Sequence, residues 1–221
     1  MANIEVVIIG QNEGRHALKM IGAIPSDWMI HYVADRCTDD TVEMLSRYPV
    51  DIVDTTGLGL QGRQTAFCRN LGLSRCGVES DVLFLDGDRY PVAGSLRGAV
   101  ESCQTEILCL PLEEDFRTEQ SFEKQYGEVN SGFYSCGVFF TRCAIEAVQD
   151  MQDGELFNSN LQEYWGIEDT SLGDLCYHLR LSASLSDKVR LRGRFERNTL
   201  DDIGVLEKRL RFRENLSVKW G

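Results

Sequence analysis

The sequence holds 221 residues, of which 43% are hydrophobic and 26% charged, a balance that is ordinary for a globular domain and excludes a disordered or collagen-like chain. Acidic residues outnumber basic ones by 35 to 23, and the net charge of −12 argues against non-specific binding to nucleic acid or anionic membranes. Basic residues gather near the end, where residues 188–219 contain ten basic and five acidic side chains. This basic C-terminal segment is where an anionic partner would be attracted.

The first half of the chain alternates short apolar runs with helical patterns. The runs are rich in β-branched residues and predict buried parallel strands at Ile4–Ile9, Trp28–Ala34, Val50–Val53 and Val82–Leu85. Helices are predicted between them at Arg15–Ile21, from Val42 onward, and at Arg63–Ser74. This order predicts an α/β fold with a mostly parallel central sheet flanked by helices.

The second half of the chain is less regular. Strands are expected at Ile107–Leu110, Gly137–Phe140 and Val189–Phe195, and helices at Cys143–Met151, Asp169–Leu181 and Asp201–Phe212. No linker, repeat or low-complexity stretch interrupts the chain, so we expect one domain over residues 1–221.

Three sequence features that indicate export, membrane insertion or paired cysteines are missing, and they bear on where the protein resides in the cell. No segment approaches the ~20 apolar residues of a membrane span, and the first residues do not resemble a signal peptide. The eight cysteines contain no C-x-x-C pair, so we expect reduced, structural thiols. Together these features predict a cytoplasmic protein.

Two acids one residue apart follow the strand predicted at Val82–Leu85. Ligands of open parallel sheets bind beyond the carboxyl ends of the strands, where Asp86 and Asp88 would lie. Hard divalent cations such as Mg²⁺ prefer carboxylate oxygens as ligands, so this pair is a candidate metal site. The alternative is a simple polar turn, since Asp-Gly is a common turn dipeptide.

A second acidic pair, Glu168 and Asp169, follows Trp165-Gly at a predicted helix start. Acids in the first turn are stabilised by the helix dipole by about 0.3–1 kcal/mol each, so they can simply be helix-starting residues. Alternatively, one of them is a general base aimed into a pocket, with Trp165 as an apolar wall.

The segment Gly57-Leu-Gly-Leu-Gln-Gly62 matches the G-x-G-x-x-G fingerprint of dinucleotide-binding proteins. The fingerprint normally follows the first strand, whereas here it follows the third. The acid that the fingerprint requires should end the next strand, but Asp81 precedes that strand, and Asp86 is one of a pair of acids. A dinucleotide-dependent oxidoreductase therefore stands as an alternative to the function proposed next.

The order of the motifs is more informative than any one of them. The motifs are Asn12-Glu13, Asp35–Thr41, Gly62–Gly72, Leu83–Asp88 and Trp165–Asp169. Over roughly residues 3–181 they resemble the nucleotide-sugar glycosyltransferases of the GT-A fold, especially family 2 and the galactosyltransferase-like branch. The resemblance implies transfer of a sugar from a nucleoside diphosphate-sugar to an acceptor hydroxyl, with inversion. The family default is a UDP-sugar with Mn²⁺ or Mg²⁺.

The resemblance also implies roles for single residues. Asp35 would recognise the base or ribose of the nucleotide. Other residues would line the donor site or support the acid pair: Ile9, Gly10, Asn12, Arg63, Arg69 and Trp165. Asp86 would reach the ribose or the metal, and Asp88 would ligate the metal. Asp169 would be the catalytic base, while Glu168 would hold an acceptor hydroxyl.

The same resemblance divides the domain and leaves parts of the function open. It implies a nucleotide-binding half at residues 1–90, an acceptor and catalytic half at 91–187, and the basic C-terminal segment at 188–221. Many relatives complete the metal site with a histidine beyond the second acidic pair, and none follows His178 here. The basic residues Arg190, Arg192 or Arg194 are an alternative means of neutralising the diphosphate.

Acceptor and rival functions stay open at this stage. The acceptor could be a saccharide, a lipid-linked glycan, a protein side chain or a modified nucleobase. A nucleotidyltransferase would need a glycine-rich basic signature beside the first strand, which Gly10–Glu13 does not provide. A non-catalytic nucleotide-sugar-binding relative is a further alternative, against which both retained acidic pairs argue.

Overall fold

The computed structural model describes residues 3–62, 64–113, 122, 126, 136–161 and 167–193. The helix predicted at Asp201–Phe212 and most of the basic C-terminal segment lie outside these residues. In the part of the chain that is described, no helix has both the length and the apolar character needed to cross a membrane.

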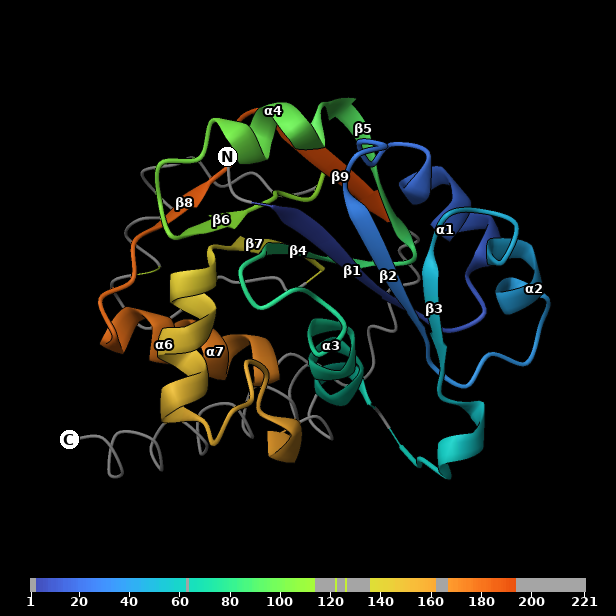
Figure 1. Ribbon diagram of the computed structural model, residues 1–221. Helices are drawn as coiled ribbons and strands as arrows, with labels where there is room; N and C mark the ends of the chain where they lie inside the picture. The colour runs from blue at the N-terminus through green and yellow to red at the C-terminus, as the bar shows by residue number, and fades with distance from the viewer. Residues whose placement is uncertain are drawn as a thin grey trace, which may run out of the picture.

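Seven strands form the central sheet in the order β3-β2-β1-β4-β7-β6-β8 (Figure 1). They are β1 (Ile4–Gly10), β2 (Met29–Ala34), β3 (Asp51–Asp54), β4 (Asp81–Asp86), β6 (Ile107–Cys109), β7 (Gly137–Phe140) and β8 (Ala183–Leu185). Strands β1 to β4 run parallel, β7 is antiparallel to β4 and β6, and β8 is parallel to β6. The mostly parallel α/β sheet predicted from the sequence is confirmed.

A second, two-stranded sheet pairs β5 (Arg89–Gly94) with β9 (Val189–Gly193) in antiparallel orientation. Strand β5 begins directly after the Asp86–Asp88 turn and was not predicted. Its residues are half-buried or exposed, so it shows no long apolar run, and Pro91 is tolerated because the strand lies at an edge.

Six α-helices of 5 to 12 residues lie in the described part of the chain. They are α1 (Gly14–Ile21), α2 (Thr41–Leu45), α3 (Thr65–Leu73), α4 (Leu96–Glu101), α6 (Arg142–Met151) and α7 (Ile167–His178). Two short 3₁₀ turns, η1 (Thr56–Leu58) and η2 (Ser159–Leu161), complete the set. Helix α7 was expected to run to Leu181 but ends at His178, because Arg180 takes a left-handed backbone conformation with φ of 59°.

The helices and the small sheet cover both faces of the central sheet (Figure 1). Val7 and Ile9 of β1 pack in a core with α3, α6 and α7, while Val6 and Ile8 pack in a second core with α1, α2, α4 and β9. This alternation follows from the two-residue period of a strand. The result is a three-layer arrangement with the sheet in the middle.

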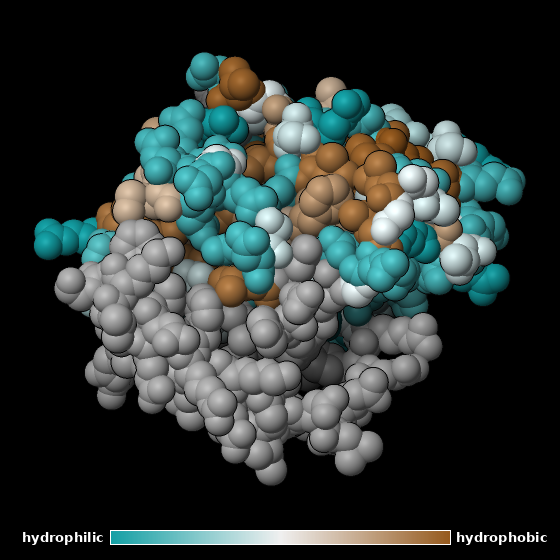
Figure 2. Space-filling view, turned by 90° about the horizontal axis from the view of Figure 1, so that it is seen from below, coloured by the Kyte–Doolittle hydropathy of each residue, from teal (hydrophilic) through white to brown (hydrophobic). Residues whose placement is uncertain are grey.

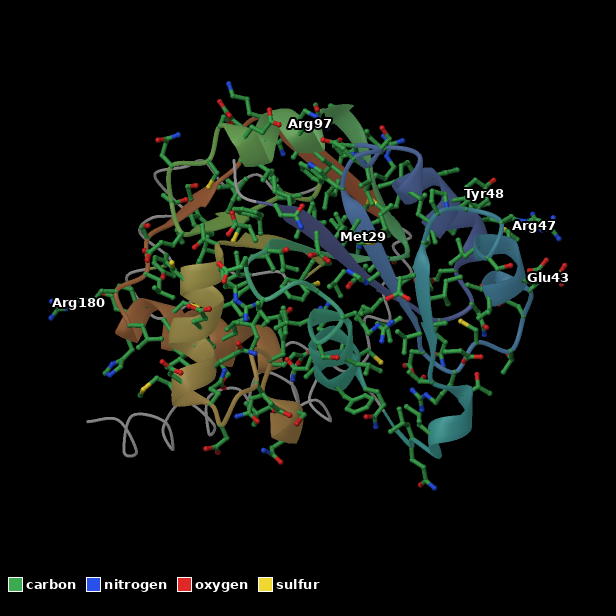
Figure 3. The ribbon with its side chains drawn as sticks, in the orientation of Figure 1. Met29, Glu43, Arg47, Tyr48, Arg97 and Arg180 are labelled. Atoms are coloured by element: carbon green, nitrogen blue, oxygen red, sulfur yellow. The ribbon has the colours of Figure 1, made fainter. Side chains whose placement is uncertain are left out.

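Outside these cores the described surface is mainly hydrophilic. In the view from below, hydrophilic residues surround a patch where apolar residues gather (Figure 2). Glu43 of α2 and Arg47, just after that helix, point outward and form an ion pair of 2.8 Å between two well-exposed side chains (Figure 3). Such a pair contributes only about 0.3–0.5 kcal/mol, so the fold depends on its cores rather than on surface charge.

Helix α3 lies close to the sheet because of one glycine. A Cβ added at Gly72 would lie 2.3 Å from Cγ1 of Val7 and 3.3 Å from Cγ2 of Val33, and both valines are fully buried. The close approach brings Arg69, one turn earlier on α3, to the carboxyl end of β4. Gly72 therefore positions a side chain of the site described below.

We expect Gly72→Ala to destabilise the fold. Forcing a methyl group into a packed core typically costs about 1–3 kcal/mol, and the better helix propensity of alanine returns at most about 1 kcal/mol. Gly98→Ala is the matched control, because a Cβ at this helical glycine of α4 would have its nearest neighbour at 3.7 Å. Chemical denaturation of both variants measures the difference. Equal stability of the two variants would contradict the close approach of α3 to β1.

Candidate active site

Three parallel strands end side by side at one edge of the central sheet. The Asp35 amide, just after β2, donates to the carbonyl of Gly10 at the end of β1 (2.9 Å). The Gly87 amide, just after β4, donates to the carbonyl of Ile9 (2.7 Å). The structure therefore brings Ile9, Gly10, Asp35 and the Asp86–Asp88 turn to one edge, which is where an open α/β sheet binds its ligands.

Two glycines at this edge make room for polar side chains beneath them. A Cβ at Gly10 would lie 2.3 Å from the hydroxyl oxygen of Tyr32, and a Cβ at Gly87 would lie 2.8 Å from Oε2 of Glu13. Burial raises the pKa of Tyr32, and the charge of Glu13 raises it further, so the hydroxyl stays neutral. Tyr32 was not singled out from the sequence, because it stands within a strand pattern that also predicts core residues.

Asp35 is held by its own neighbour in the chain. Nε and Nη2 of Arg36 donate to its two carboxylate oxygens at 2.7 and 2.8 Å. The Arg36 backbone is left-handed, with φ of 50°, and its amide donates to the hydroxyl of Thr55 (3.0 Å). The bidentate pair fixes the direction of the carboxylate, which retains lone pairs for a further donor.

Asn12 joins the loops after β1 and β2. Its Oδ1 accepts from the amide of Thr38 at 2.8 Å and from that of Asp39 at 3.3 Å, and its own backbone is left-handed with φ of 59°. We expected Asn12 to line the nucleotide pocket. The contacts show that its side-chain amide braces the loop that carries Asp35, and its place in the nucleotide pocket stays a prediction.

Asp86 and Arg69 form a buried ion pair below the same edge. Nη2 of Arg69 lies 2.7 Å from Oδ1 of Asp86, and the Arg69 side chain is only 3% exposed. The guanidinium also lies over the ring of Phe157, with its carbon 5.4 Å from the ring centre. The predicted support of the acid pair by Arg69 thus has a direct contact.

The second acidic pair lies close to Arg69. Glu168 and Asp169 occupy the first turn of α7, where Glu168 is 2% exposed and Asp169 is half-buried. Burial alone would lower the pKa of the guanidinium, but nearby carboxylates raise it overall, namely those of Asp86, Asp169 and Glu168. Two acidic motifs that are distant in sequence therefore both act electrostatically on the guanidinium of Arg69, which contacts Asp86 directly.

Asp88 points to a different set of neighbours. Its Oδ1 lies 3.2 Å from Nε of Arg89, and its side chain is 20% exposed. Burial raises the pKa of Asp88, the guanidinium of Arg89 opposes that rise, and the charge of Asp86 adds to it. A divalent cation beside Asp88 would relieve this repulsion.

The donor set of the Asp86–Asp88 turn fits a hard cation. In the described part of the chain, no side chain binds Oδ2 of either acid, so each carboxylate offers one oxygen. Mg²⁺ and Mn²⁺ are commonly held by one or two carboxylates and complete their shells with water and phosphate oxygens. The residues present are therefore compatible with such an ion.

The fold of this chain is similar to solved structures, whereas its sequence matches no family. Neither a family model nor a curated protein sequence matches the chain. Solved structures do match, among them S. aureus TarS 1–349 in complex with UDP, at a TM-score of 0.60 and 16% identity. Mannosyl-3-phosphoglycerate synthase from Rubrobacter xylanophilus matches at a TM-score of 0.62 and 14% identity, over 99% of this chain and 75% of that one. The chain has the GT-A fold.

Another GT-A structure, GalNAc-T7 with UDP, GalNAc and Mn²⁺, matches at a TM-score of 0.63 and 12% identity, over 88% of this chain and 44% of that one. The match to TarS 1–349 with UDP covers 87% of this chain, which spans 60% of that protein. The resemblance predicted from the motif order is thus confirmed at the level of the fold.

Two predicted site residues of this GT-A domain, Arg63 and Trp165, lie outside the described residues.

The position of the glycine-rich loop in the sheet bears on the alternative of a dinucleotide-dependent oxidoreductase. The Gly57–Gly62 loop follows β3, the outermost strand of the sheet, and includes the 3₁₀ turn η1 at the periphery (Figure 1). A dinucleotide fingerprint belongs instead to the first βα turn, so the loop does not favour an oxidoreductase.

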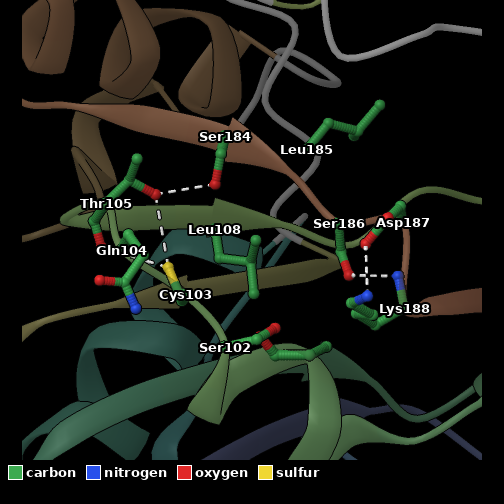
Figure 4. A pocket seen from close by; sticks show the side chains of 11 residues that line it. Ser102, Cys103, Gln104, Thr105, Leu108, Ser184, Leu185, Ser186, Asp187 and Lys188 are labelled. Carbon is green, nitrogen blue, oxygen red and sulfur yellow. Dashed lines mark hydrogen bonds and ion pairs between the residues drawn. The ribbon is translucent and has the colours of Figure 1, made fainter.

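A separate cavity of about 250 Å³ lies beside the edge strand β8 of the GT-A sheet (Figure 4). Its lining includes Cys103, Thr105 and Ser184, and the hydroxyl oxygens of Thr105 and Ser184 lie 2.8 Å apart. None of the predicted site residues lines this cavity. The candidate active site is therefore the carboxyl edge of β1, β2 and β4.

Proposed function

We propose that the protein is a glycosyltransferase that moves a sugar from a UDP-sugar to an acceptor hydroxyl with inversion, assisted by Mn²⁺ or Mg²⁺. The GT-A fold supports this proposal, as do the neighbours whose structures contain UDP or UDP with GalNAc and Mn²⁺. These neighbours share 16% identity or less with the chain, so the activity is inferred from the site.

One observation carries the proposal. The buried guanidinium of Arg69 binds Asp86 at the end of β4 and is raised in pKa by the carboxylates at the start of α7. The acids proposed to hold a cation and the acid proposed for proton transfer thus influence the same guanidinium, which supports assigning them to one site.

Binding of the donor is assigned to the edge residues. Asp35, fixed in direction by Arg36, accepts a hydrogen bond from the base or ribose. Asp86 and Asp88 would hold the divalent cation, which supplies positive charge against the diphosphate as it leaves. Asn12 braces the loop that carries Asp35 and so preserves the shape of the nucleotide pocket.

Catalysis is assigned to the start of α7. Asp169 takes the proton from the acceptor hydroxyl while its oxygen attacks the anomeric carbon. The bond from that carbon to the phosphate oxygen breaks, and UDP leaves with the electron pair. Attack opposite to the leaving group inverts the configuration. Glu168 binds the acceptor or orients the turn, and Arg69 keeps both motifs in place.

Binding of UDP in the presence of Mn²⁺ tests the proposal. Wild-type protein at a UDP concentration of 100 Kd should gain about 2.7 kcal/mol of stability, seen as a rise in melting temperature. Asp88→Asn should lose the part of this gain that EDTA removes from the wild type, because the amide is a poorer ligand for the cation.

Asp187→Asn is the matched control, since this acid is 84% exposed and lies outside the site. It should respond to UDP and Mn²⁺ like the wild type. NADH should give no shift in any variant. A UDP-induced shift that is the same with Mn²⁺ and with EDTA would contradict the metal assignment, and a shift with NADH alone would favour the oxidoreductase.

A further inference from the structure

A second group of titratable side chains lies at the other end of the sheet from the candidate active site. Glu5 is the second residue of β1 and His31 is the third residue of β2, whereas the donor site lies beyond the carboxyl ends of these strands. Cys76 follows α3. Both Glu5 and His31 are buried, at 5% and 4% exposure.

The three residues of this group bring potential ligand atoms close together. Nε2 of His31 lies 2.6 Å from Oε2 of Glu5. One potential ligand atom from each of Glu5, His31 and Cys76 can be chosen so that all three lie within 4.8 Å of one another. The three residues therefore offer an oxygen, a nitrogen and a sulfur around one point.

We propose that Glu5, His31 and Cys76 bind Zn²⁺, independently of the proposed sugar transfer. Carboxylate, imidazole and thiolate are the ligands that zinc takes in proteins, at about 2.0–2.3 Å. Neighbouring ligand atoms of a tetrahedral site then lie roughly 3.3–3.6 Å apart. In the structure the three ligand atoms lie within 4.8 Å of one another, and they would adjust toward that spacing around the ion. Cys76 is only partly buried, so a water molecule completes the shell.

Neighbouring groups already orient two of these ligands. Oδ2 of Asp51 lies 2.9 Å from Nδ1 of His31, and this contact holds the ring with Nε2 facing Glu5. The other Glu5 oxygen, Oε1, accepts from the Ser80 hydroxyl (2.6 Å) and from the Gly77 amide (2.9 Å). A carboxylate behind the histidine and donors behind the glutamate are the supports that metal-ligating residues have in zinc sites.

Metal binding would replace protons in this cluster. Zn²⁺ bound here would take the place of the hydrogen bond between Nε2 of His31 and Oε2 of Glu5, and of the thiol proton of Cys76.

Titration with Co²⁺ alone tests this site, because cobalt occupies zinc sites and shows an intense charge-transfer band only when a thiolate is a ligand. Wild-type protein, stripped of metal by a chelator, should develop this band with one equivalent of Co²⁺, and added Zn²⁺ should abolish it. Cys76→Ser should lose the band. Cys143→Ser is the matched control, since this thiol is exposed and distant in sequence, and it should keep the band.

Asp51→Asn should keep the band but bind Co²⁺ about 10–100-fold more weakly, the usual cost of removing a carboxylate behind a ligating histidine. Asp88→Asn should leave the band unchanged, which separates this site from the proposed donor site. The proposal is overturned if the wild type shows no thiolate band, or if Cys76→Ser retains it. A protein that fails to bind UDP but shows the Cys76-dependent band would contradict the proposed function alone.

Discussion

Asp169→Asn should lower kcat of sugar transfer by roughly 10²–10⁴-fold, the range for loss of a positioned general base. The amide has nearly the same shape as the carboxylate but cannot take a proton from the acceptor hydroxyl. Donor affinity should stay close to that of the wild type, because Asp169 is not assigned to the nucleotide. Steady-state kinetics and UDP-sugar binding on the same variant measure both quantities.

Glu168→Gln is the matched control for this result. Adjacent residues of a helix point about 100° apart, so only one of the two acids is well aimed at the attacking hydroxyl. Glu168→Gln should mainly raise KM for the acceptor. A nearly active Asp169→Asn beside an inactive Glu168→Gln would reverse the two roles. Two active variants would show that the pair only starts α7, where losing one acid costs at most about 1 kcal/mol of stability.

Arg69→Met should destabilise the protein by about 3 kcal/mol. Removing one partner of a buried ion pair costs about 3–5 kcal/mol, and we expect the lower end of this range because water reaches Asp86. The Asp86 side chain is 28% exposed, whereas Glu168 is 2% exposed. Methionine keeps much of the length of the arginine, so the effect reports the lost charge rather than a cavity. Urea denaturation measures the change.

A second substitution separates the partners of Arg69. If Asp86 is its main partner, Asp86→Asn in the Arg69→Met background should recover part of the loss, because it removes the charge left without a partner. If Glu168→Gln recovers more than Asp86→Asn does, then Arg69 chiefly supports the start of α7. Full wild-type stability of Arg69→Met would contradict the structural role of the pair.

The first half of the fold could be predicted because its strands are continuous apolar runs. Strands β1, β2 and β4 are buried on both faces and therefore read as unbroken apolar segments. Strand β5 contains Pro91 and is half-exposed, and β8 has only three residues. Such short or open strands exist through their pairing partners, which a local pattern does not reveal.

The contacts at the candidate site could not be predicted from the sequence. Motif order indicated Asp86 and Asp169, yet only the fold shows that Asp86 contacts Arg69 and that the charge of Asp169 raises the pKa of the same guanidinium. The sequence also does not reveal that Oδ1 of Asn12 accepts hydrogen bonds from the amides of Thr38 and Asp39. Asp35 pairs with Arg36, whose backbone is left-handed. Arginine rarely adopts this conformation, so the pair could not be predicted from the sequence.

The strand order has a consequence for how the chain folds. Strand β1 pairs with β4 through Ile4 and Asp81, and β6 pairs with β8 through Ile107 and Ala183, so each pairing closes a long loop. Closing such loops costs entropy before the contacts form, which makes folding slow compared with a helical bundle of this size. Arg69 and Asp86 belong to the segment completed by β4, whereas α7 lies between β7 and β8 in the chain. The proposed donor-site residues thus precede β7 in the chain and the proposed catalytic acid follows it, so the site is complete only when both segments have packed on the sheet.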